Sequence, residues 1–131
     1  MAGNRVVAHY RDGRLVKGTT SDFLPTRDYF HVAPDGGGAP VAVPIGELKA
    51  LFFVKDLVGD PQHQARNEFD PAKPAPGRKI RVTFKDGEVM VGTTQGYQPG
   101  RVGFFVAPAD PHSNTERCFV IAAATTEVGF V

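Results

Sequence analysis

The side chains best suited to catalysis or metal binding are few and scattered along this chain. Its four histidines share no metal-ligand spacing: His9, His31, His63 and His112. One cysteine and no His-x-x-x-His pattern give no basis for a zinc site. Ser21 and Ser113 lack the glycines of a nucleophile elbow. We therefore expect a protein without enzymatic activity, metal or cofactor.

The single cysteine, Cys118, precedes Phe119 at the start of an expected strand. Arg117 is the only basic neighbour that could lower its pKa, so a buried, inert thiol is favoured over a reactive one. A lone cysteine forms no internal disulfide and fits a reducing compartment. No signal peptide and no apolar run of membrane-helix length is recognisable, so we expect a cytoplasmic protein.

Two arginines stand at the same place in two similar segments. Arg27 follows Pro25 by two residues, and Arg101 follows Pro99 by two residues. A loop arginine can hold a carboxylate or a phosphate through two parallel hydrogen bonds. It can equally bind the carbonyl groups of its own loop. Both interpretations of these arginines stay open from the sequence.

The best candidate for partner binding is the polar loop over residues 109–117. It is longer than the equivalent loop earlier in the chain, and loops on rigid scaffolds often carry function. Asp110, Asn114 and Arg117 are the residues that we expect to meet a partner there. The structural alternative is a local turn with an Arg–Asp pair.

An internal repeat sets the elements that position these residues. The segment Tyr10–Thr20 recurs as Phe84–Thr94, with Asp-Gly and Gly-Thr-Thr in the same register. The match continues without a gap through Pro34 and Pro108. Such a repeat predicts two copies of one small unit.

Each copy reads as five short strands. Apolar residues alternate before Asp12-Gly13 and Asp86-Gly87, which predicts two-residue type I′ hairpin turns with positive φ at both central residues. Gly18 and Gly92, inside the following strands, are typical of a bulge or a sharp bend. Gly46–Lys49 could form a single helical turn.

The predicted fold class is all-β, with two tandem five-stranded barrels joined by a proline-containing linker. The first barrel covers residues 1–58, the linker 59–77 and the second barrel 78–131. Units of about 55 residues have marginal cores. We therefore expect the units to bury apolar side chains against each other or against a second chain, the candidates being Leu51, Phe52, Phe53 and Phe130.

Five strands with an early Asp-Gly hairpin, a glycine within a strand and a closing apolar strand resemble the Sm-like (SH3-type) barrel. The RNA pocket of that fold uses an Asn in its first motif and an Arg-Gly step in its second. This chain has Asp22-Phe23-Leu24-Pro25 at the first place, and Pro44-Ile45-Gly46 and Phe52-Phe53-Val54 at the second. The resemblance therefore implies the fold but not the RNA site.

The chain also resembles a bacterial domain family of unknown function that often accompanies signalling domains such as PilZ. The residues that carry this resemblance are Glu47–Asp56 in the first half and, in the second, Gly103–Pro111 with Asn114, Arg117, Phe119 and Val120. It implies a bacterial source and a regulatory setting, and no catalytic residue.

The formal net charge of +1 argues against a protein that binds nucleic acid through phosphate contacts alone. We expect a non-catalytic protein-interaction or adaptor module in bacterial signalling, binding through the 109–117 loop or an open strand edge. The alternative is an Sm-like protein that binds RNA or a nucleotide. Homo-oligomer formation is an open possibility, and no membrane association is expected.

Overall fold

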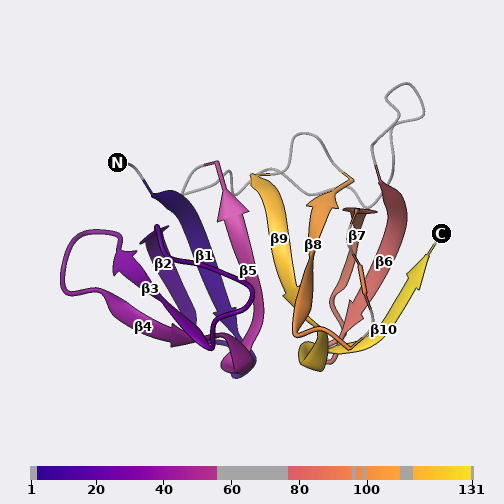
Figure 1. Cartoon of the computed structure of the whole chain (residues 1–131), viewed down its shortest axis with the longest axis horizontal. Helices are drawn as coiled ribbons and strands as arrows, with labels where there is room; N and C mark the ends of the chain where they lie inside the picture. The colour runs from indigo at the N-terminus through magenta and orange to yellow at the C-terminus, as the bar shows by residue number, and fades with distance from the viewer. Residues whose placement is uncertain (1–2, 56–76, 96, 99, 110–113, 131) are drawn as a thin grey trace.

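The computed structural model describes residues 3–55, 77–95, 97–98, 100–109 and 114–130. These residues form β-strands joined by turns and two 3₁₀ turns, Ile45–Glu47 (η1) and Ala122–Ala124 (η2), in an all-β fold (Figure 1). The strands are β1 Asn4–Tyr10, β2 Leu15–Thr20, β3 Tyr29–Pro34, β4 Val41–Pro44, β5 Leu48–Val54, β6 Arg78–Phe84, β7 Val89–Thr94, β8 Gly103–Pro108, β9 Thr115–Ile121 and β10 Thr125–Phe130. Five strands per repeat and a helical turn before β5 were predicted.

The strands form one continuous antiparallel sheet, in the order β10-β6-β7-β8-β9-β5-β1-β2-β3-β4. The expectation of two closed five-stranded barrels is therefore not met, because the sheet is open. The fifth strand of the first repeat, β5, pairs with β9 of the second repeat instead of returning to β4. Figure 1 shows β5 and β9 side by side at the centre, with β4 and β10 at the outer edges.

The two Asp-Gly hairpins match each other, but their turns differ from the predicted type. Only the glycine has a positive φ, +94° at Gly13 and +93° at Gly87. In the first hairpin Gly13 N–H donates to the Tyr10 carbonyl, and Tyr10 N–H donates to the Arg14 carbonyl. This is a three-residue loop with a glycine bulge. The Asp12 carboxylate accepts the Arg14 N–H at 3.0 Å, which stabilises a negative φ at the aspartate.

Gly18 and Gly92 occur where two strands approach each other too closely for a side chain. A Cβ at Gly18 would lie 2.0 Å from the Ala33 carbonyl oxygen, and one at Gly92 would lie 2.1 Å from the Ala107 oxygen. The pairing β2–β3 is short here, as is β7–β8. The glycines therefore permit the close contact between the second and third strands of each repeat.

The apolar core runs through both repeats. Val6, Ala8 and Tyr10 of β1 are buried on one face, as their alternation predicts, and Ile80, Val82 and Phe84 of β6 repeat the pattern. At the junction Leu51 pairs with Phe119, and both side chains are almost fully buried. The two repeats thus bury apolar side chains against each other.

The neighbouring residues Phe52 and Phe53 lie on opposite faces of β5, as strand geometry requires. Phe53 is buried with Phe23, Phe105 and Phe119 around it. Phe52 is half-buried, with its ring 4.7 Å from the His9 ring. The strand β5 therefore contributes to the packing on both faces of the sheet.

Candidate binding cleft

A cleft of about 930 Å³ lies where the two repeats meet. One wall is the loop between β2 and β3, residues 25–28, from the first repeat. The opposite wall is residues 100–102, the equivalent loop of the second repeat, before β8. The ends of β7 and parts of β8 and β9 complete the cleft. Its position thus depends on the β5–β9 pairing that joins the repeats.

Arg27 and Arg101, which occupy the same place in the repeat, both line this cleft. Both are exposed. Arg101 donates from Nε to the Gln98 Oε1 at 2.7 Å, a bond that uses one of its three guanidinium nitrogens. Within the described residues, the Arg27 side chain forms no hydrogen bond or ion pair. The repeat therefore places one guanidinium on each wall.

Arg117 brings a third guanidinium to the cleft, from β9. Its Cζ lies 4.4 Å from the centroid of the Phe53 ring and 4.8 Å from that of Phe105. Cation–π contacts of this kind fix the direction of an exposed arginine. Arg117 is thus held in place by the aromatic cluster at the junction while its guanidinium stays exposed.

The floor of the cleft is apolar. Phe104 and Phe119 are buried, and Phe105 is half-buried. The Phe105 and Phe119 rings are 5.0 Å apart in an edge-on arrangement. A single carboxylate, that of Asp28, lines the cleft together with the three arginines. This combination suits a ligand with negative charge and an apolar group.

The predicted partner-binding residues separate into three groups. Arg27, Arg101 and Arg117 line the cleft, whereas Asn114 is not among its lining residues. The Asn114 carbonyl accepts the Lys55 N–H at 2.8 Å, next to the β5–β9 pairing. Asp110 lies outside the described residues, so the predicted local Arg–Asp pair is not tested. The partner-binding role of all five stays a prediction.

Sequence reasoning missed the apolar part of the cleft. Phe105 and Phe119 read as ordinary strand residues, and nothing in their local pattern marks them as the floor of a site. The signal that could have found the cleft is the shared position of Arg27 and Arg101, since equivalent loops meet when adjacent repeats pack in the same order.

The remaining titratable groups show no catalytic arrangement in the described part of the chain. Cys118 is fully buried, and burial raises the pKa of its thiol far above the usual value. Burial, followed by the nearby Lys49 charge, lowers the pKa of His9. No group of three His, Cys, Asp or Glu side chains that could hold a metal occurs among the described residues.

One histidine has a carboxylate partner at the surface. His31 Nδ1 lies 2.8 Å from Asp22 Oδ2, and the His31 N–H donates to Asp22 Oδ1 at 2.9 Å. The side-chain hydrogen bond from His31, with the backbone one, lowers the pKa of Asp22. No serine or cysteine accompanies this pair in the structure, so it reads as a link between the β2–β3 loop and β3.

An internally repeated, all-β chain with an arginine-rich cleft at the repeat junction is the class that the fold and the site define. The chain belongs to a family of unknown function (DUF6982), whose model matches residues 2–131. A search of curated proteins and a search of solved structures each gave no significant match. Among the described residues, no helix has the length and apolar character needed to cross a membrane.

Proposed function

We propose that this protein is a non-catalytic interaction module whose junction cleft binds an acidic segment of a protein partner. The observation that carries the proposal is the convergence of Arg27, Arg101 and Arg117 on one cleft with an apolar floor. A bacterial, cytoplasmic signalling setting and an Sm-like ancestry of the repeats belong to the same proposal. They rest on the sequence resemblances alone.

An acidic ligand is favoured by the charges that line the cleft. Three guanidinium groups face one carboxylate, Asp28, although the whole chain carries a net charge of only +1. Arginine binds carboxylates through two parallel hydrogen bonds, and such bonds are stronger inside a partly water-excluded cleft. The local positive charge therefore selects for Asp and Glu side chains or a chain-terminal carboxylate.

A peptide fits the cleft better than a nucleic acid does. Proteins that bind single-stranded nucleic acid offer exposed aromatic faces on which bases stack. Here Phe104 and Phe119 are 4% and 2% exposed, so their faces are already covered by protein. The cleft can still take an apolar peptide side chain above Phe105, which is half-buried.

The test measures binding of fluorescein-labelled peptides by anisotropy. A panel of acidic peptides containing one Phe or Leu is compared with the same peptides in which Gln replaces Glu. Wild type should bind acidic members, and Arg27→Gln should weaken binding about tenfold, since charge-assisted contacts contribute roughly 1.5–3 kcal/mol each. Arg27 is the arginine to change because no described side chain depends on it.

The matched control is Arg81→Gln, which removes the same charge from the exposed face of β6, away from the cleft. This variant should bind as wild type does. Equal loss in both variants would mean that only overall charge matters. Binding of single-stranded RNA oligomers, lost steeply with added salt, would assign the arginines to phosphate instead of carboxylate and reverse the ranking of the two functions.

A further inference from the structure

The two edges of the sheet come from different positions in the repeat. One edge is β4, the fourth strand of the first repeat, and the other is β10, the fifth strand of the second repeat. Their equivalents, β9 and β5, are paired with each other at the centre. The molecule thus displays, within itself, how a fifth strand is covered.

The side chains beside the covered strand recur at the open edge β10. Phe53 lies opposite Val6, and Phe130 lies opposite Ile80 at the equivalent place. The Phe23 and Phe53 rings are 5.8 Å apart, and the Tyr97 and Phe130 rings are 5.6 Å apart in the same arrangement. The same pair of aromatic residues therefore stands at both places.

What differs is the cover over that aromatic pair. At the junction, Phe105 and Phe119 of the second repeat pack against Phe23, and Phe53 is buried. At the open edge, Phe130 is 40% exposed. The Arg78 guanidinium lies 3.7 Å from its ring centroid and is the nearest cover given by the protein itself. An aromatic junction residue is therefore exposed beside an unpaired strand.

The other edge, β4, is a poor complement for β10. The Ile45 N–H donates to Asp28 of the β3 side, so Val43 and Val41 also face β3, while Pro44, Ala42 and Pro40 face the open side. Two of those three residues have no N–H, which protects an edge against strand addition. The aromatic cover is also missing, because His31 and Ala42 stand where the second repeat has Phe105 and Phe119.

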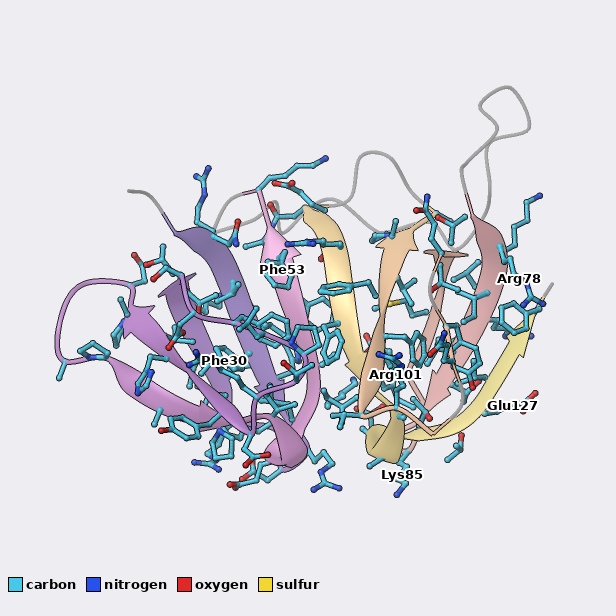
Figure 2. All side chains as sticks on the ribbon, viewed as in Figure 1. Phe30, Phe53, Arg78, Lys85, Arg101 and Glu127 are labelled. Atoms are coloured by element: carbon cyan, nitrogen blue, oxygen red, sulfur yellow. The ribbon has the colours of Figure 1, made fainter. Side chains whose placement is uncertain are left out.

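We propose that β10 pairs with β10 of a second copy of this chain, antiparallel and about a two-fold axis. No proline interrupts Thr125–Phe130, so this edge keeps its backbone donors. Arg78 and Glu127 lie toward opposite ends of the strand (Figure 2), and both are exposed. An antiparallel arrangement brings Arg78 of each copy toward Glu127 of the other, which matches opposite charges twice.

A two-fold dimer of this kind closes on itself. Pairing of β10 with β4 would leave the same two edges free on every complex and would grow further unless a ring formed. Pairing of β10 with β10 uses both reactive edges at once, and the edges that remain are the proline-protected β4 strands. The prolines on one edge and their absence on the other are both explained by this assembly.

Sedimentation equilibrium of the full chain over a wide concentration range tests the proposal. Wild type should reach twice the mass of one chain. Glu127→Arg and Arg78→Glu should each raise the dimer dissociation constant about tenfold or more, since each places two like-charge pairs across the dyad. An equimolar mixture of these two variants should dimerise again, because every Arg then faces a Glu.

The control is Ala42→Pro, which removes the remaining outward N–H of β4 and should leave the dimer mass unchanged. Loss of assembly in this variant would show head-to-tail pairing and would overturn the proposal. A wild-type chain that stays monomeric at the highest concentrations would also overturn it. So would a mixture of the two charge variants that fails to recover the dimer. Circular dichroism of each variant verifies that the chain is folded.

Discussion

Lys49 Nζ donates a hydrogen bond to Asp86 Oδ2 at 2.7 Å, and this bond connects β5 of the first repeat to the β6–β7 hairpin of the second. Glu88 of the same hairpin is a second ion-pair partner of Lys49. The lysine is buried and lies 4.7 Å from the Phe84 ring centroid, whereas both carboxylates are half exposed. The repeats are thus joined by charge as well as by the β5–β9 pairing.

Lys49→Met should lower the free energy of unfolding by about 1–3 kcal/mol, since hydrogen bonds to charged groups contribute this much. Methionine keeps most of the apolar stem but leaves Asp86 and Glu88 without their cation. Urea unfolding followed by circular dichroism measures the change. Lys85→Met is the matched control, because Lys85 is an exposed lysine of the same hairpin, and its effect should stay within about 0.5 kcal/mol. Equal effects in the two variants would contradict a role for the Lys49 cluster.

The same cluster predicts a loss of stability in acid. The hydrogen bond from Lys49, with that from the Glu88 N–H, holds the pKa of Asp86 below its usual 3.8. The folded protein therefore binds the Asp86 proton less readily than the unfolded chain, and this stabilising contribution is lost as the pH falls below about 3.8 through the folded value. Melting temperatures of wild type and Asp86→Asn should differ near neutral pH and converge in acid. A difference that stays constant with pH would contradict this cause.

The strands could be predicted from the sequence, but their assembly could not. Alternation before Asp12-Gly13 and the repeated register gave both hairpins and five strands per repeat, because these depend on neighbours along the chain. Whether β5 pairs with β4 or with β9 depends on backbone groups at strand edges, which every residue carries. Pro40 and Pro44 contained part of the answer, since they weaken β4 as a partner, but their meaning requires knowing which side of β4 is open.

The candidate site was predictable in its residues but not in its location. Arg27 and Arg101 were recognisable as an equivalent pair from the repeat. Their convergence on one cleft requires the first-repeat loop to lie across the second repeat, and this follows from the β5–β9 pairing. Type I′ turns were wrong for a local reason, because an aspartate whose carboxylate accepts the N–H two residues on stays at negative φ.

Arg117→Ala should destabilise the junction in the absence of any ligand. The side chain covers Phe53 and Phe105, and cation–π contacts at exposed sites contribute roughly 0.5–1 kcal/mol each. We expect a loss of about 1 kcal/mol in urea unfolding. Arg117→Lys, which keeps a cation and an aliphatic stem, should recover part of that loss. Arg101→Ala is the comparison at the same cleft without a ring contact, and a larger effect there than at Arg117 would contradict the argument.

Gly18→Ala and Gly92→Ala should each cost several kcal/mol, about 3 or more, because a methyl group cannot occupy either place. The added Cβ would meet a backbone carbonyl oxygen at 2.0 Å in the first case and 2.1 Å in the second, and backbone cannot rotate away as a side chain can. Relief requires β3 to separate from β2, or β8 from β7, which opens the core beneath Val32 or Val106. Gly46→Ala is the control, since nothing lies within 4 Å of a Cβ at Gly46.

Thermal unfolding of the three glycine variants separates steric exclusion from a general dislike of alanine in this fold. The Gly46 variant should melt close to wild type, and the Gly18 and Gly92 variants should melt far lower or fail to fold. Because the core is continuous across both repeats, either severe substitution should unfold the whole chain in one transition. Two separate transitions, one for each repeat, would show that the β5–β9 junction does not couple them.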